Sequence, residues 1–375
     1  MKKLIAIAVV FVLAVGTAFA VDLGGTVFGH VNVLEGATGK DKSGDDEVLA
    51  SSGGFDRLRI EGGGEAGDTF GGWIRFDTTG GNFVGGLSGL AWWKPIDMFK
   101  LTIGGNPDAI WAKEGVTGWG FNQMPYDSGI ALGGGNIWGG GIVDGLKTRH
   151  AFYGGYGDPR AAIEFKPIDM LGINIAIPFA KSEGDDLFKA VVAQIDLNFD
   201  FGNIALTYDG GDGDGALFVY FGGSFGDLGL DVGIGYHLTS DSNDPAHPFY
   251  AGLGIKYATD AFGIKFRTAL GIPSEDTDGF KAIFDLLPYY AFSDNVSFFF
   301  NMGVGISGPP SAGPKKDDDA VISWFINPYL RVGAEWGPTF YVGLQVSSDG
   351  VKGSSGDGDA SKIKFAVPVS LMVSF

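Results

Sequence analysis

The sequence predicts an all-β protein, a closed antiparallel transmembrane β-barrel of about 18 strands, with about 16 as the alternative count. Three observations predict it. Apolar and polar residues alternate along many segments, tight-turn residues recur at short intervals, and short connections alternate with long ones. Glycine is abundant, at 65 residues, and cysteine is absent. The missing cysteines suit a wall that is closed by its own hydrogen-bond ladder and needs no disulfides.

Residues 1–20 have the features of a targeting segment. Lys2 and Lys3 precede an apolar run that ends near Val15, and Ala18-Phe19-Ala20 forms a small-residue cleavage site. The run is too short for a membrane helix, so we expect a signal peptide that is removed after Ala20. We expect residues 21–375 to form a single barrel domain. No later stretch has the ~18 continuous apolar residues of a membrane helix, and the other structure that spans a bilayer is a closed barrel.

The last segment, from Lys362 to Phe375, shows the alternation most clearly. Its odd-numbered positions from Ile363 to Phe375 are all apolar, whereas Lys362, Lys364 and Ser370 lie among the even-numbered positions. A half-buried strand of a soluble sandwich alternates in the same way, and a secreted β-sandwich is therefore an alternative. The length of the segment favours a tilted membrane crossing.

Eight sites carry the Gly, Asn, Asp and Pro combinations that tight turns require. They lie at 67–68, 95–97, 167–169, 201–203, 226–227, 259–260, 293–295 and 337–338. Longer polar connections separate them, as at 35–54, 238–248 and 306–319. Eight hairpins with a first and a last strand give the predicted count and place both termini on the periplasmic side. Three prolines, Pro288, Pro328 and Pro368, fall inside predicted strands, where each should mark a bulge or a strand end.

Aromatic residues cluster beside the short turns. They include Trp92, Trp93, Phe99, Phe165, Phe199, Phe225, Tyr257, Phe262, Phe292, Trp336 and Phe340. Aromatic rings favour the boundary between lipid headgroups and hydrocarbon. We therefore expect these residues to form one of the two interfacial girdles.

In these features the chain resembles the outer-membrane porins. The resemblance covers nearly all of residues 21–375 and rests on the targeting segment, the alternating strands, the rhythm of turns and loops, and the final Phe375. It implies a passive diffusion channel for small hydrophilic solutes or ions, surrounded by lipid of the cell outer membrane. It also implies that Phe375 belongs to the signal read by the barrel-assembly machinery, and it allows a homotrimer. The alternative function is a surface adhesin or structural antigen without a channel role.

Charged residues recur on the face opposite the apolar one. Charge in a dry core costs several kcal/mol when unpaired, so these side chains suit a water-filled pore. The candidate pore-lining residues are Arg57, Arg59, Arg75, Asp77, Lys100, Lys265, Arg267, Arg331, Lys362 and Lys364, and Glu61, Arg160, Glu164 and Lys256 face the same way. Closure should place the last strand beside the first. The basic residues of both ends would then form one stretch of wall, unless they pair with neighbouring carboxylates.

The longest connection, Gly105–Pro159, is read as one acidic loop. Its carboxylates are Asp108, Glu114, Asp127 and Asp144. The resemblance implies that this loop folds inward and constricts the pore. An acidic loop facing a basic wall would create a transverse field that selects solutes by size and polarity. The loop also carries Trp111, Trp119 and Trp138, which could stack on sugar rings or cap the mouth.

Several other function classes are disfavoured. The net charge of −18 argues against nucleic-acid binding, which needs a basic footprint. Residues 222–226 match G-x-S-x-G but lead into another strand, where a nucleophile elbow needs a helix. The four histidines have no nucleophile or acid at useful spacing. Residues 209–215 resemble one isolated calcium-binding repeat, and a flexible acidic loop is the favoured interpretation. We therefore expect no enzyme activity, no cofactor and no metal site.

Overall fold

The computed structural model describes residues 20–37, 50–79, 85–105, 111, 160–178, 191–210, 215–238, 249–273, 280–307, 321–333, 337–348 and 363–374. These residues form one antiparallel β-sheet. Within the described ranges, no helix is long and apolar enough to cross a membrane. The strands are β1 (Ala20–Ala37), β2 (Ala50–Ala66), β3 (Phe70–Thr79), β4 (Gly85–Ile96), β5 (Phe99–Gly105), β6 (Arg160–Ile168), β7 (Leu171–Pro178), β8 (Val192–Phe199), β9 (Gly202–Asp209), β10 (Ala216–Phe225), β11 (Leu228–His237), β12 (Phe249–Ala258), β13 (Phe262–Ile272), β14 (Lys281–Ser293), β15 (Val296–Ser307), β16 (Val321–Gly333), β17 (Pro338–Gly343), β18 (Gln345–Ser348) and β19 (Ile363–Ser374).

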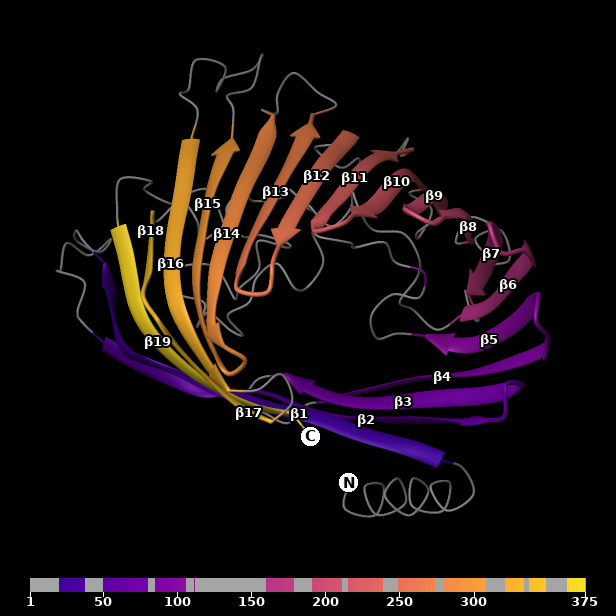
Figure 1. Ribbon diagram of the computed structural model, residues 1–375, viewed down its shortest axis with the longest axis horizontal. Helices are drawn as coiled ribbons and strands as arrows, with labels where there is room; N and C mark the ends of the chain where they lie inside the picture. Colours follow the sequence, from indigo (N-terminus) through magenta and orange to yellow (C-terminus); the bar gives the residue numbers. More distant parts are fainter. Residues whose placement is uncertain are drawn as a thin grey trace.

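The sheet closes on itself as a barrel. Each strand pairs with its neighbours in the chain, and β1 pairs with β19 from Thr26↔Ser374 to Ala37↔Lys364, so the first and last strands lie side by side (Figure 1). Strands β17 and β18 both lie between β16 and β19 in one continuous register. They therefore form a single crossing, interrupted at Leu344, and the barrel has 18 crossings. The predicted fold class and strand count are confirmed.

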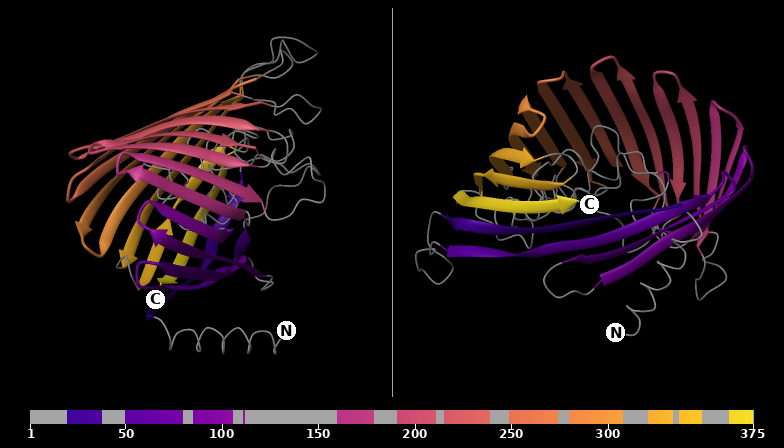
Figure 2. Two further views of the ribbon diagram at one scale, coloured as in Figure 1. Left: turned by 90° about the vertical axis from the view of Figure 1, so that its right-hand side faces the viewer. Right: turned by 60° about the horizontal axis from the view of Figure 1, so that its bottom comes forward.

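All eight predicted turns connect neighbouring strands. Gly67 and Gly226 adopt φ angles of 61° and 63° in the β2–β3 and β10–β11 turns, a conformation that favours glycine. Because connections alternate in a closed antiparallel barrel, these turns share one end of it (Figure 2). Strand β5 pairs directly with β6 from Phe99↔Phe165 to Gly104↔Arg160, so these two strands are direct neighbours in the wall.

The two faces of the wall differ in polarity. Large apolar side chains on the outer face are exposed, among them Ile74, Ile163 and Leu371, as expected of a surface that contacts lipid. Among the residues predicted for the girdle, those exposed on this face beside the turns are Trp93, Phe165, Phe199, Phe225, Tyr257, Phe262, Phe292 and Phe340, in agreement with a girdle. Trp92 was wrongly assigned to it. Its ring lies against the position of Gly71 on the inner face, on the same side as Lys100; Trp336 lies outside the described residues.

Two of the three prolines do not behave as predicted. Pro368 fits, because the β1–β19 register shifts beside it, between Asn32 and Leu34. Pro288 lies within β14 with the same register before and after it. Pro328 also lies within a continuous strand, β16, and the interruption falls at Leu344 on the partner strand.

The wall satisfies the backbone at Pro328 with a side chain. The Leu344 N–H donates to the Pro328 carbonyl at 2.9 Å, but proline has no N–H to return the bond. The Asn327 side-chain amide donates instead to the Leu344 carbonyl, at 3.0 Å. A proline is tolerated here because the residue before it replaces the missing donor.

Candidate functional site: the inner face of the barrel

Three cross-strand ion pairs lie on the inner face of β2, β3, β5 and β6. Arg59 of β2 is the register partner of Asp77 of β3, and the Nη2–Oδ2 distance is 2.9 Å. One rung closer to the turn the signs are reversed, since Glu61 of β2 pairs with Arg75 of β3 at 2.7 Å. The two rungs therefore form an alternating pattern of charge in which each sign lies beside its opposite.

A third pair extends this surface to β5 and β6. The Nζ of Lys100 lies 3.1 Å from Oε1 of its register partner Glu164. Aromatic rings contact two of these cations. The Arg75 guanidinium lies 4.7 Å from the ring centroid of Trp73, and the Lys100 ammonium lies 5.7 Å from that of Trp92. Cation–π contacts of this kind hold long side chains in place.

The cations on β13 and β16 have different surroundings. Arg267 donates to Asp285 on β14 through Nε at 3.0 Å and Nη2 at 2.5 Å, and both side chains are buried. Lys265 lies directly opposite Lys256 on β12. Arg331 lies over the ring of Phe299, 5.5 Å from its centroid.

The remaining predicted site residues are only partly within the described structure. The backbones of Arg57 and Lys364 lie in β2 and β19, but their side chains lie outside the described residues, as does all of Lys362. The acidic loop residues Asp108, Glu114, Asp127 and Asp144 and the terminal Phe375 also lie outside them. In the described part of the expected basic stretch, Arg59 and Arg75 each lie beside a carboxylate.

Trp111 is the one described residue of the segment between β5 and β6, and it lies against the inner face. Its side chain packs on Ala162, Ala176 and Val192, three buried residues on neighbouring strands β6, β7 and β8. Its backbone carbonyl accepts a hydrogen bond from Gln194 at 3.1 Å. The two alanines leave space for the indole, so small side chains and one amide form a seat for Trp111.

A hydrogen-bond network holds Gln194 in position. Gln194 accepts from Thr207 at 2.8 Å and donates to Asp196 at 3.1 Å, and Asn174 donates to the same carboxylate at 2.8 Å. The sequence analysis missed this network. The signal was available, since Asn174, Gln194 and Asp196 are each flanked by apolar residues in alternating strands.

A second buried polar pair was also missed. The Tyr220 hydroxyl donates to Asp231 on the next strand at 2.5 Å. The Tyr220 side chain lies over Gly222, where a Cβ atom would collide with its hydroxyl. Glycine therefore allows the tyrosine to reach a carboxylate that lies diagonally across the β10–β11 pair.

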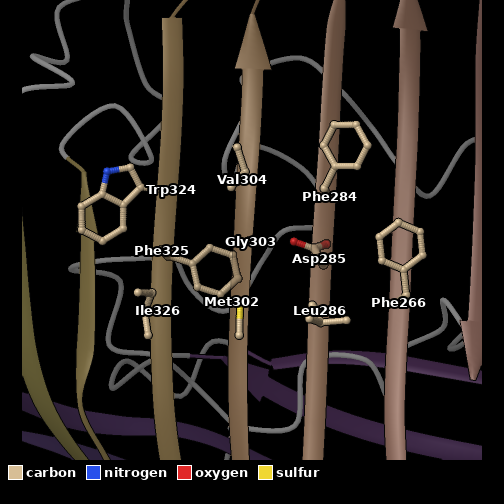
Figure 3. Close-up of a pocket in the computed structure, with 10 residues that line it drawn as sticks. All are labelled: Phe266, Phe284, Asp285, Leu286, Met302, Gly303, Val304, Trp324, Phe325 and Ile326. Carbon is tan, nitrogen blue, oxygen red and sulfur yellow. The ribbon is translucent and has the colours of Figure 1, made fainter. Parts of the chain in front are cut away.

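The hollow between β13 and β16, of about 400 Å³, does not belong to the polar interior. Figure 3 shows its ten lining residues on four adjacent strands. Phe284, Val304 and Ile326 belong to the exposed apolar rows of the outer face, and neighbouring Met302 and Trp324 are also apolar. This hollow is part of the outward surface.

Comparisons with known proteins identify the fold. No protein-family model matches the chain, and no curated protein is similar to it in sequence. Among solved structures, OmpF of Salmonella typhi in complex with daunomycin matches with a TM-score of 0.54, 11% identity, and coverage of 95% of this chain and 97% of that chain. OccK11 (OpdR) of Pseudomonas aeruginosa matches with the same TM-score, identity and coverage. The fold is that of a porin-type barrel. This porin-type barrel is closed by β1 and β19 and carries its charged side chains on the inner face.

Proposed function

We propose that this porin-type barrel is a passive diffusion channel for small hydrophilic solutes in an outer membrane. The observation that carries the proposal is the contrast between its faces. The outer face exposes large apolar side chains, whereas the inner face carries ion pairs such as Arg59–Asp77 and Lys100–Glu164 that remain 15–36% exposed. An apolar band outside and polar residues inside are the features of a membrane barrel with an aqueous interior.

We propose the charged residues on the inner face of β2–β6 as the pore lining, with a weaker field than a basic wall would create. Arg59 and Arg75 lie within 2.9 Å of Asp77 and Glu61, and opposite charges this close largely cancel at the distance of a passing ion. We therefore expect the channel to show only a weak preference between small cations and small anions. Replacing Arg57, Arg59 and Arg75 by serine should therefore raise cation preference, because the carboxylates remain.

We propose the 105–159 segment as the pore constriction. Two contacts support this proposal. The Trp111 side chain packs on Ala162, Ala176 and Val192, and Gln194 donates a hydrogen bond to the Trp111 carbonyl. The acidic residues Asp108, Glu114, Asp127 and Asp144 would then narrow and charge the passage. Shortening the segment should raise single-channel conductance.

The targeting and assembly features complete the proposal. Residues 1–20 would be removed during export, and the barrel of 21–375 would be inserted by the barrel-assembly machinery through a signal that includes Phe375. Outer-membrane lipid would then surround the apolar face. A homotrimer is compatible with a porin-type barrel, and chemical cross-linking in detergent would test it.

Conductance of the purified barrel in planar bilayers tests the function. Stepwise current increases on insertion, with a reversal potential close to zero in a salt gradient, are expected. A surface adhesin or structural antigen is the competing function. Folded, membrane-inserted protein that passes no current would favour it and end the channel proposal.

A further inference from the structure

Most side chains of the ion pairs of β2–β6 remain accessible although they lie on the inner face, and the buried exception is Arg75, at 6% exposed. The side chains of Arg59 and Asp77 are 20% and 23% exposed, Glu61 is 31% exposed, and Lys100 is 36% exposed. Side chains that keep this much surface are in contact with water. This accessible strip spans the consecutive strands β2 to β6.

Many polar side chains on the inner face of β13–β19 are buried at comparable heights above the turns, although Lys265 and Arg331 are only partly buried. Asn301 of β15 and Gln345 of β18 have no exposed surface, and Asn327 of β16 is 1% exposed. The Arg267–Asp285 pair, about as far from its turn as Arg75 is from its own, is 1% and 0% exposed. The two sides of the barrel thus differ in hydration although both carry polar residues.

A stack of aromatic rings explains part of this burial. Tyr289, Phe299, Tyr329 and Tyr341 come from successive strands, and Phe299 and Tyr329 stack with centroids 4.8 Å apart and planes 6° apart. Tyr289 stacks on Phe299 at 26°, Tyr341 is tilted by 47° against Tyr329, and Leu287 completes the cluster. The facing sides of Phe299 and Tyr329 are therefore closed to a solute.

We propose that water and solutes pass along the β2–β6 strip, and that the inner face of β13–β19 is a dry supporting wall that takes no part in conduction. This inference rests on the proposed channel function and adds to it the side of the barrel on which the path lies. The path presents both signs of charge, with Arg59 and Asp77 accessible side by side and the accessible Glu61 backed by the buried Arg75. It therefore suits neutral polar or zwitterionic solutes better than ions of a single sign.

The chain offers a matched pair of serines for the test. Ser88 of β4 is the register partner of Arg75 and is partly exposed, whereas Ser347 of β18 has no exposed surface. The natural chain has no cysteine, so a single introduced thiol reports on one position. Ser88→Cys and Ser347→Cys change the same hydroxyl to the same thiol without changing charge.

The experiment is modification by a water-soluble cationic methanethiosulfonate reagent during recording from single barrels in planar bilayers. Both variants must first conduct like the unmodified protein, which also shows that they fold. If Ser347→Cys does not, it is replaced by Ser370→Cys, which lies beside Tyr341 on the same inner face and is 2% exposed. We expect reagent to reduce the Ser88→Cys current at least about tenfold faster than the Ser347→Cys current, because thiol reactivity follows access to water.

The outcomes separate the two proposals. Equal rates at both positions, or an unmodified Ser88→Cys, would overturn the placement of the path while leaving the channel intact. A folded protein without cysteine that passes no current would instead overturn the channel function itself.

Discussion

In the proposed channel, removing one member of the Arg59–Asp77 pair should create ion selectivity, and the charge that remains should favour ions of the opposite sign. Asp77→Asn leaves Arg59 unbalanced and should favour anions. Arg59→Gln removes the cation beside Asp77 and should favour cations. The two charges are 2.9 Å apart in the natural chain, so each is now masked by the other.

The magnitude follows from Coulomb's law. A unit charge about 4 Å from a passing ion changes its energy by about 1 kcal/mol in water and by about 4 kcal/mol at an effective dielectric constant of 20. The side chains are 20% and 23% exposed, and salt in the pore screens them, so the lower figure applies. About 1 kcal/mol corresponds to a roughly fivefold change in the ratio of cation to anion permeability.

Reversal potentials in a potassium chloride gradient measure that ratio. The two single variants should shift the potential in opposite directions, and the double variant Arg59→Gln/Asp77→Asn should return it close to that of the natural chain. Shifts of the same sign, or a double variant that keeps a single variant's selectivity, would refute the reasoning that pairing neutralises this wall.

Four further predictions follow from the fold and the site. Trp111→Ala should raise single-channel conductance, because it removes the contacts that hold the 105–159 segment against the inner face, whereas Trp93→Ala on the outer face should not. Equal conductance of the natural protein and both variants would show that Trp111 does not hold a constriction. Asp285→Asn should destabilise the barrel by about 3 kcal/mol, because it leaves Arg267 buried without its carboxylate, while Asp77→Asn should cost about 1 kcal/mol or less; urea unfolding would rank the two. Deleting Phe375 should lower the amount of assembled barrel in membranes, and unchanged levels would remove it from the assembly signal. The natural protein should fractionate with outer membranes and change its gel mobility on boiling, because a closed ladder resists detergent until heated; a soluble protein with one mobility would contradict the barrel.

The strand order was predictable because its signals are local. Turn chemistry at sites such as 226–227 and the alternation from Ile363 to Val373 depend only on neighbouring residues. Those signals fixed eight hairpins and hence the closed wall. The prolines were predicted less well, since the sequence shows the missing donor at Pro328 but not that Asn327 reaches across to replace it.

The inner face was predictable as a set of residues but not as a set of contacts. Alternation places Arg59, Glu61, Arg75 and Asp77 on one face, yet pairing depends on the register between β2 and β3. A slip of two residues would bring Arg59 opposite Arg75 and create the basic wall. The degree of burial was equally hard to predict, because nothing local distinguishes the partly exposed Glu61 from the buried Asp285.

The exchange of a backbone donor for a side-chain amide at Pro328 limits the order in which two positions can change. If Asn327 is lost first, the Leu344 carbonyl has no donor at a depth where water is scarce, and an unsatisfied group there is costly. If Pro328 changes first to a residue with an N–H, the ladder is restored and Asn327 becomes free to vary. A double-mutant cycle with Asn327→Ala and Pro328→Ala should therefore show strongly non-additive changes in the free energy of unfolding. Asn327→Ala should destabilise the barrel only while the proline is present. Additive effects on unfolding would mean that the amide and the proline evolve independently.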